Sequence, residues 1–479
     1  MIQFHNTPTG KVEEFTPIEA GKVSIYTCGP TVYSTPHIGN FMAYIRWDIL
    51  VRTLQANGLD VTRVMNITDV GHLVSDGDDG EDKILKGALR EGITMREVAD
   101  RYTAEFMDGM QQLNLLAPTY VTKATDFIDE QIALVQVLEQ KGFTYVIDDG
   151  VYFDTSKFPR YADFAHLDLE GMKAGARVDH NSQKRNISDF ALWKFDTTGQ
   201  RKEMVWESPW GAGFPGWHLE CSAMIKAKLG DTIDIHTGGV DHIPVHHTNE
   251  IAQSEAANDK PLANYWLHGA HLLTDGTKIS KSLDNVHTLS DLNEHDLTPI
   301  DFRMFALQSH YRTESNFTWD NLAAAHNRLH RWQHIAALRW QLHDTLVDDD
   351  EKDLHDTSAK LLAAPHAALE ALNDDLNTPE ALRVIDEAFE TIEATNLAHI
   401  QQEALEQLLA FIDDTLGLKL RESTPDISDE QKQLILERQR ARENKDWSRS
   451  DEIRDELAQQ NIVLNDTPHG VRWSRQNLA

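Results

Sequence analysis

Two short segments of this 479-residue chain carry groups suited to nucleotide chemistry, although they lie about 240 residues apart. The first runs from His37 to Asn40, where a predicted strand has just ended and a predicted helix begins. The second, residues 278–282, is a loop with two lysines. A helix start favours anions through its free N–H groups and its dipole, and the lysines add positive charge. Together they predict a site that holds ATP and stabilises departing pyrophosphate. The candidate catalytic residues are His37, Asn40, Lys278 and Lys281.

The order and setting of these segments resemble the class I aminoacyl-tRNA synthetases, whose two signatures are usually written HIGH and KMSKS. Two departures are present: Asn40 stands in the fourth place of the first motif, and Ile279 stands in the second place of the other. Asn keeps a hydrogen-bond donor, and Ile keeps apolar bulk. The resemblance implies ATP-dependent activation of an amino acid.

A possible metal site involves the only two cysteines of the chain, Cys28 and Cys221. His246 and Glu250 stand four residues apart in a predicted helix over residues 246–255, so they share one helix face. Two thiolates, an imidazole and a carboxylate form a reasonable tetrahedral zinc set. Spacing alone leaves an equal alternative, in which the thiols are simply buried and the His/Glu pair is an ordinary one.

The elements that must position these groups follow from residue pattern. Val23–Cys28 reads as a strand, apolar residues after His37 recur at helical spacing as far as Asn57-Gly58, and Val61–Ile67 reads as the next strand. This is a parallel strand–helix–strand unit, and ligands of such sheets bind beyond the carboxyl ends of the strands. Cys28, His37 and Thr68 all fall at that edge.

Glycine usage divides the chain. Of 26 glycines, 24 lie at or before Gly276, and none occurs from residue 277 to 416. This predicts an α/β fold with a Rossmann-like parallel sheet, followed by helical bundles. We expect four parts: a catalytic domain over 1–123 and 216–315, an inserted connective domain over 124–215, a helical bundle over 316–424, and a small C-terminal unit over 425–479.

Composition excludes some classes of protein. No run of about 18 apolar residues occurs, which predicts no membrane span, and two cysteines in so long a chain favour the reducing cytosol. The net charge of −32 disfavours general adhesion to nucleic acid. Residues 431–479, however, carry 9 Lys/Arg against 8 Asp/Glu, so an RNA contact is expected there. The candidates are Arg440, Arg442, Trp447 and Asp451; taken alone, they also fit the charged face of an amphipathic helix.

A closer resemblance, to the cysteinyl-tRNA synthetase family, runs nearly from end to end. The segments that carry it include residues 26–33 (YTCGPTVY), 66–69 (NITD), 208–211 with 215–222 (SPWG and PGWHLECS), 234–241 and 246–250 (HHTNE). The resemblance implies that Cys28, Cys221, His246 and Glu250 bind one zinc ion, with His242 and His247 nearby but not ligands. It also implies that Cys28, Thr68, Trp217 and His236 line the cysteine pocket. Asp241 would join His37, Asn40 and Lys281 in contacting the nucleotide.

The family resemblance implies a cytoplasmic monomer that joins L-cysteine to tRNA(Cys) through a cysteinyl-adenylate, with Mg²⁺ accompanying ATP and the C-terminal unit binding the anticodon. Zinc would separate cysteine from serine by binding a thiolate. Two alternatives stay open at this point. One is a ligase that joins cysteine to an amino sugar, against which the long helical region after residue 316 argues. The other is a non-catalytic tRNA-binding relative, which would be free to lose His37 or Lys281.

Overall fold

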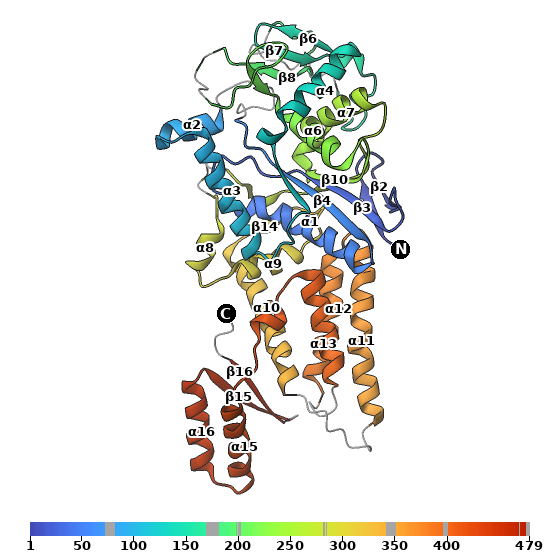
Figure 1. Cartoon of the computed structure of the whole chain (residues 1–479). Helices are drawn as coiled ribbons and strands as arrows, with labels where there is room; N and C mark the ends of the chain where they lie inside the picture. Colours follow the sequence, from blue (N-terminus) through green and yellow to red (C-terminus); the bar gives the residue numbers. More distant parts are fainter. Residues whose placement is uncertain are drawn as a thin grey trace. The chain divides into compact units, whose positions relative to one another are not determined.

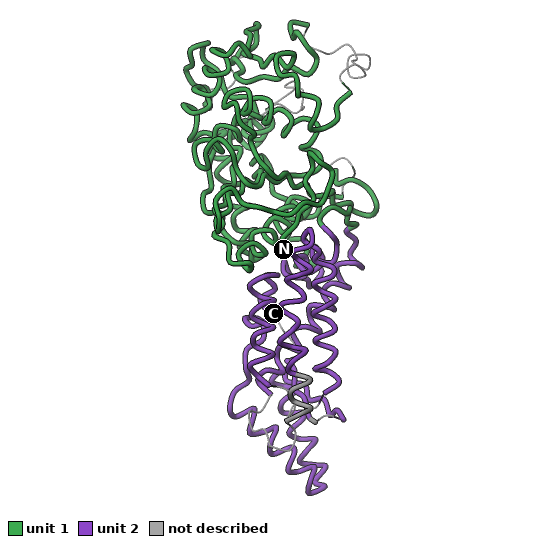
Figure 2. The backbone as a smooth tube through the Cα atoms, turned by 90° about the vertical axis from the view of Figure 1, so that its right-hand side faces the viewer, with its two compact units in different colours: residues 1–294, 311–316 green, residues 295–310, 317–479 purple. Residues whose placement is uncertain are grey.

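A computed structural model describes residues 1–71, 82–168, 182–197, 199, 203–280, 283, 285–341, 351–395, 401–468 and 470–475. The chain forms two compact units (Figure 2), the first comprising Met1–Glu294 with Tyr311–Asn316 and the second comprising His295–His310 with Phe317–Ala479. No helix among the described residues is both long and apolar enough to cross a membrane.

The first unit is built on a parallel sheet (Figure 1), in which the strands stand in the order β11-β10-β3-β4-β5 and all four pairings are parallel. The predicted strand–helix–strand unit is therefore confirmed. The strands are β3 (Lys22–Thr27), β4 (Asp60–Ile67), β5 (Tyr120–Lys123), β10 (Ile233–Gly239) and β11 (Ala263–Gly269). The larger helices of the unit are α1 (Ile38–Ala56), α3 (Met95–Gln112), α4 (Ile128–Gln140), α6 (Trp217–Leu229) and α7 (Thr248–Asn258).

Helix α1 is buried along most of its length, and an internal ion pair joins two of its buried polar side chains. Arg52 Nε donates to Asp48 Oδ2 at 2.7 Å, and both side chains are nearly inaccessible to solvent. Asp48 Oδ1 also accepts from the backbone N–H of Leu116, and Arg52 Nη2 donates to the carbonyl of Asn114, each at 2.7 Å. These bonds anchor the segment between α3 and β5 to the middle of α1.

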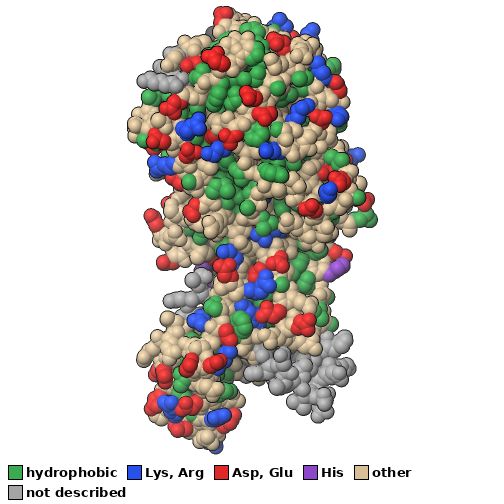
Figure 3. Space-filling model, in the orientation of Figure 1, with side chains coloured by type: hydrophobic (Ala, Val, Ile, Leu, Met, Phe, Trp, Pro, Cys, Tyr) green, Lys and Arg blue, Asp and Glu red, His purple; other side chains and the backbone are tan. Residues whose placement is uncertain are grey.

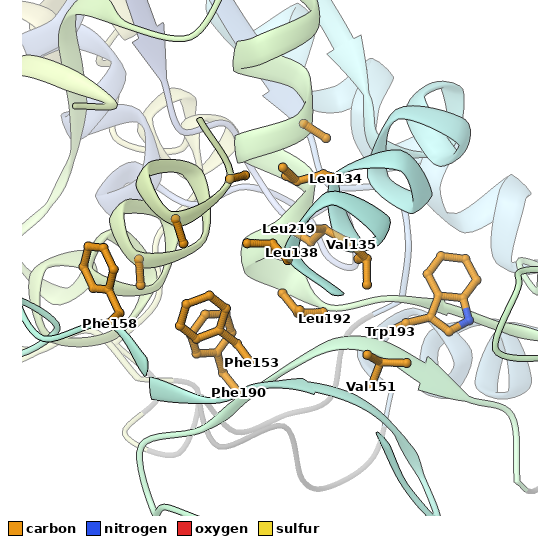
Figure 4. Packing of buried hydrophobic residues seen from close by; sticks show 14 of the residues in the cluster. Leu134, Val135, Leu138, Val151, Phe153, Phe158, Phe190, Leu192, Trp193 and Leu219 are labelled. Carbon is orange, nitrogen blue, oxygen red and sulfur yellow. The ribbon is translucent and has the colours of Figure 1, made fainter. Parts of the chain in front are cut away.

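Residues 124–215 include a separate antiparallel sheet of order β6-β7-β8-β9. Its strands are β6 (Thr144–Ile147), β7 (Gly150–Phe153), β8 (Phe190–Phe195) and β9 (Gly213–Pro215). One apolar core joins this sheet to α4 and α6 (Figure 4). Within it the rings of Phe153 and Phe190 stack with centroids 5.0 Å apart, and Leu138 and Leu219 pack nearby. The helix that carries Cys221 therefore packs against residues of the segment 124–215.

Smaller elements complete the first unit. They are the pair β1 (Gln3–Asn6) and β2 (Lys11–Glu14), and the helices α2 (Lys83–Glu91) and α8 (Leu289–Asn293). A further sheet consists of β12 (Leu272–Thr274), β13 (Thr277–Lys278) and β14 (Ser315–Phe317). The last residue of β14, Phe317, belongs to the second unit.

The second unit is mainly helical, as predicted. Its helices are α9 (Pro299–Leu307), α10 (Trp319–Ala337), α11 (Glu351–Asn373), α12 (Thr378–Glu393), α13 (Gln402–Phe411), α14 (Leu420–Ser423), α15 (Asp429–Glu443) and α16 (Trp447–Gln459). It ends in a hairpin of β15 (Ile462–Thr467) and β16 (Gly470–Arg475), which the sequence analysis did not predict. The strand residues Asn465, Asp466 and Thr467 are polar, so the hairpin lacks the alternation typical of a half-buried strand.

Candidate active site

A cleft of about 580 Å³ opens beyond the carboxyl ends of the parallel strands in the first unit. Cys28 directly follows β3, Thr68 follows β4, and Gly238 and Gly239 end β10; all four line the cleft. This is the edge at which the sequence pattern placed the candidate groups. A parallel sheet brings residues from distant parts of the chain together there.

His37 and Asn40 form the start of α1 at this cleft. His37 is the N-cap, with an extended backbone, and its ring Nδ1 accepts from the N–H of Asn40 at 3.3 Å. In return Asn40 Oδ1 accepts from the N–H of His37 at 3.0 Å. This reciprocal arrangement is a capping box, so Asn40 has a role in shaping the helix start that the sequence analysis did not assign. Histidine is not a preferred N-cap residue, so this cap could not be recognised from residue type alone.

The second motif lies against the first, despite their separation in the chain. The N–H of Ile38 donates to the carbonyl of His287 at 2.8 Å. A Cβ placed on Gly39 would stand only 2.7 Å from Cδ1 of Ile279, so the two motifs approach closely here. Lys278, at the end of β13, lines the same cleft. Lys281, predicted as a catalytic residue, lies outside the described residues.

The four candidate metal ligands converge, with ligand atoms that all lie within 4.8 Å of one another. Glu250 Oε1 is 2.8 Å from His246 Nε2 and 4.0 Å from Cys28 Sγ, and Cys221 Sγ is 3.6 Å from His246 Nε2. Cys221, His246 and Glu250 are buried, and Cys28 is partly exposed. The cluster could hold a metal ion.

The local backbone differs from the single helix expected over residues 246–255. His246 lies in a wide π-helical turn, Ile243–His247, and Glu250 lies in α7, which begins at Thr248. A π turn contains one extra residue and is often found at functional sites. His246 and Glu250 still lie close together, because the turn continues into α7 without a break.

A second combination of ligands overlaps the first. Cys28 and Glu250 also lie within ligand distance of His236 and His247. His247 Nδ1 is already hydrogen bonded to His268 Nε2 at 2.7 Å. Cys28, Cys221 and His246 line the cleft, whereas His236 and His247 are not among its lining residues. An ion bound by the set with two sulfurs would therefore face the cleft more directly than one bound by the second set.

The electrostatics of the cluster favour a cation. A hydrogen bond from Cys28 lowers the pKa of Cys221 to about 7 against the effect of burial, while burial raises the pKa of Cys28 well above its ordinary value. Burial opposes protonation of His246, but the charge of Glu250 and the bond to Cys221 outweigh it and raise its pKa to about 10. Burial acts against ionisation of Glu250 too, yet His236 and His246 hold its pKa well below the ordinary range. A divalent ion would replace the protons held on the sulfur and imidazole atoms.

Contacts behind the four candidate ligands orient them. His218 Nδ1 lies 2.9 Å from His246 Nδ1, and His236 Nε2 lies 2.9 Å from Glu250 Oε2. Such outer contacts commonly fix the orientation and tautomer of metal ligands. His236, predicted to line the cysteine pocket, lies behind Glu250, and its ring stacks on Trp266 with centroids 4.6 Å apart. His218 was not predicted, although it stands three residues before Cys221.

The other predicted pocket residues surround the cluster. Trp217, the first residue of α6, packs on His246 with ring centroids 4.5 Å apart and lines the cleft. The buried hydroxyl of Thr68 donates to Glu220 Oε2 and accepts from Asn66 Nδ2, each at 3.0 Å. Glu220 is fully buried and was missed, because one carboxylate in a helical run gives no signal by itself.

Asp241, predicted to contact the nucleotide, is exposed on the cleft wall just after β10. A Cβ on Gly239 would lie 2.3 Å from its Oδ1, so the carboxylate lies close against this strand end.

The candidate tRNA contacts lie on α15 and α16 of the second unit. Arg442 Nη1 pairs with Asp466 at 2.7 Å, and its guanidinium lies 5.9 Å from the centre of the Trp447 ring. Asp451 pairs with Arg454 at 3.0 Å, whereas Arg440 is exposed. Trp447 is 58 % exposed, although tryptophan is on average highly buried. On the face drawn in Figure 3, acidic and basic side chains are interspersed.

Three family models match the chain. Residues 14–327 match "tRNA synthetases class I (C) catalytic domain", residues 369–421 match "DALR domain", and residues 424–473 match "Cysteinyl-tRNA ligase anticodon binding domain". Solved structures agree in fold: a methionyl-tRNA synthetase of Mycobacterium tuberculosis has a TM-score of 0.57 at 15% identity and covers 84% of this chain and 92% of its own. A LeuRS–tRNA complex of Agrobacterium radiobacter has a TM-score of 0.61 at 11% identity and covers 85% of each chain. The fold and the catalytic-domain match define a class I aminoacyl-tRNA synthetase.

Curated relatives narrow the family. The chain is 44% identical to Cysteine--tRNA ligase 1 of Burkholderia lata over 98% of this chain and 96% of that protein. It is 41% identical to Cysteine--tRNA ligase of Treponema denticola over 99% of each. The chain belongs to the cysteine--tRNA ligase family, whose enzymes charge tRNA with cysteine.

Proposed function

We propose that the chain ligates L-cysteine to tRNA(Cys) in two steps, through a cysteinyl-adenylate, and that zinc bound by Cys28, Cys221, His246 and Glu250 selects the cysteine. The observation that carries this proposal is that the cysteine-rich cluster opens into the same cleft as the start of α1 and Lys278. One cavity can therefore hold an amino acid beside a nucleotide.

The chemistry of the donor set fits zinc, since two thiols with nitrogen and oxygen donors suit a borderline-soft ion. When bound, zinc would supply an affinity for the substrate thiolate that a serine hydroxyl could match only at a far higher cost of ionisation. An apolar pocket separates such similar side chains by only about 10–200-fold. Thr68 and Trp217 would hold the rest of the amino acid, and His236 would act through Glu250.

In the first step a cysteine carboxylate oxygen bonds to the α-phosphorus of ATP, and the bond to pyrophosphate breaks. Catalysis of this displacement requires alignment of the reactants and stabilisation of the departing charge. His37 and Asn40 would present hydrogen-bond donors at the helix start, and Lys278 and Lys281 would neutralise the pyrophosphate. Asp241 would contact the nucleotide, with Mg²⁺ accompanying ATP.

In the second step a terminal ribose hydroxyl of tRNA attacks the adenylate carbonyl, and AMP leaves. We propose that residues 425–479 read the anticodon, with Arg440, Arg442, Trp447 and Asp451 at the contact. An exposed ring beside a guanidinium suits stacking on an unpaired base. The four-part domain division, a monomeric state and a cytoplasmic location complete the proposal.

The test is isotope exchange between ATP and pyrophosphate with purified, zinc-loaded protein. We expect exchange that depends on cysteine and is not supported by serine, followed by charging when tRNA(Cys) is added. Exchange without charging would favour a small-molecule ligase, and the absence of exchange would favour a non-catalytic tRNA-binding protein.

A further inference from the structure

Helix α10 of the second unit carries a row of histidines that the proposed function does not use. His326, His330 and His334 follow one another at intervals of four residues, so their side chains lie on one face of the helix. The rings of His326 and His330 have centroids 5.8 Å apart and nearly parallel planes, and those of His330 and His334 have centroids 4.2 Å apart. Two histidines one helical turn apart are an arrangement that binds zinc in metalloproteases.

The carboxylate of Asp301, on α9, holds the first histidine of this row. Asp301 Oδ2 accepts from both the N–H and the hydroxyl of Thr298, at 2.7 and 2.8 Å, which fixes the carboxylate at the start of α9. Its other oxygen lies 3.0 Å from Nδ1 of His326. In a neutral ring this contact favours the tautomer with the proton on Nδ1, which leaves the lone pair on Nε2. A carboxylate behind a histidine in this manner is a common feature of metal sites.

The distances permit a shared ion. With a metal–nitrogen bond of about 2.1 Å, an ion lies roughly 3.3 Å from the centre of each ring that binds it, so two ligating rings have centres less than about 6.6 Å apart. Both neighbouring pairs in the row meet this limit, and the contact of Asp301 with His326 favours the pair His326 and His330. The side chain of His326 is 40% exposed, which gives an ion a path from solvent.

We propose that His326 and His330 form a second metal site, which binds one divalent transition-metal ion of borderline softness (Zn²⁺, Ni²⁺ or Cu²⁺), with Asp301 as the positioning residue behind His326. Imidazole nitrogen suits these three ions, and solvent fills the remaining coordination positions. The site lies on residues of the second unit alone and shares no ligand with the cysteine-rich cluster of the first.

The test titrates full-length protein that carries a single zinc ion per chain with Ni²⁺ and measures both metals after dialysis. We expect one Ni²⁺ per chain while the zinc content stays constant. H326A and H330A each weaken Ni²⁺ binding at least tenfold, and D301N weakens it by about 10–100-fold, as loss of an outer contact does. The matched control is H366A, because His366 is an exposed helical histidine of the same unit outside the row, 3.7 Å from Glu370.

A spectroscopic measurement separates the assigned pair from its neighbour. With Cu²⁺ in place of Ni²⁺, electron paramagnetic resonance should show coupling to two imidazole nitrogens in the wild type and in H334A, and to one in H326A. The proposal is overturned if no Ni²⁺ binds, if H330A binds as the wild type does, if H366A weakens binding equally, or if H334A rather than H326A removes one nitrogen coupling.

Discussion

Replacement of Glu250 by Gln gives the sharpest prediction about the cysteine-rich cluster in its metal-free state. The Glu250 carboxylate is fully buried, with one oxygen 2.8 Å from His246 Nε2 and the other 2.9 Å from His236 Nε2. E250Q keeps the shape of the side chain and removes its charge. His246 then loses the anion that favours its protonation, and the buried ion pair with Glu250 disappears.

The magnitude follows from the protonation of His246. Each tenfold change in proton affinity corresponds to about 1.4 kcal/mol, so the rise of the His246 pKa from 6.5 to about 10 amounts to about 5 kcal/mol. Removal of one partner from a buried ion pair typically costs about 3–5 kcal/mol. Metal-free E250Q should therefore lose about 3–5 kcal/mol of folding free energy, which corresponds to a fall in melting temperature on the order of 10 °C for a unit of this size.

The pH dependence has a definite sign. Because the folded pKa of His246 lies above its ordinary value of 6.5, its stabilisation is fully present below about pH 6.5 and is lost as the pH rises toward 10. The folded pKa of Glu250 lies below its ordinary value of 4.5, so its stabilisation is present above that pH and is lost in acid. Metal-free wild type should be most stable between about pH 4.5 and pH 6.5. Its stability should fall above pH 6.5, and this fall should be much smaller in E250Q.

The assay is calorimetric melting of chelator-treated protein at several pH values. The matched control is E255Q, the same substitution further along α7, where the carboxylate pairs with the exposed side chain of Arg160 at 2.6 Å. An ion pair with an exposed partner contributes about 0–1 kcal/mol, so E255Q should melt close to the wild type. The reasoning is refuted if E250Q melts within 2 °C of E255Q, or if both variants keep the wild-type decline at alkaline pH.

Three further predictions concern function. C221S should retain almost no zinc and lose cysteine-dependent exchange of pyrophosphate; normal zinc content would exclude Cys221 as a ligand. K278A should slow exchange at least tenfold with zinc unchanged, and an unaltered rate would remove Lys278 from the ATP site. W447A should lower charging of tRNA(Cys) at least tenfold while exchange stays at the wild-type rate, since base stacking contributes about 1–3 kcal/mol; equal loss of both activities, or of neither, would contradict a role in tRNA binding alone.

The parallel core could be predicted because its signals are local. Val23–Cys28 and Val61–Ile67 are apolar strands separated by one helix, and the handedness and binding edge of such a unit follow from general rules. The terminal hairpin could not be predicted in the same way. Its strands carry Asn465 and Asp466, and Asp466 is held by ion pairs with Arg438 and Arg442 on α15 rather than by an alternating apolar face.

In the candidate site, too, some features could be predicted from the sequence and others could not. Residue type and the spacing of His246 and Glu250 suggested the four candidate ligands, and the family resemblance chose them over buried thiols with an ordinary His/Glu pair. The outer contacts of His218 and Glu220 depend on which helix face meets which neighbour, and one sequence does not contain that information. The choice between His246 and His247, which are adjacent in the chain, likewise depends on the π turn that orients both rings.

The most direct measurement is zinc X-ray absorption spectroscopy of the purified protein without substrate. Coordination by Cys28, Cys221, His246 and Glu250 predicts two sulfur ligands at about 2.3 Å and two nitrogen or oxygen ligands at about 2.0–2.2 Å. The alternative set, Cys28 with His236, His247 and Glu250, gives one sulfur. A spectrum with one sulfur, or protein that holds no zinc after purification without chelators, would contradict the account.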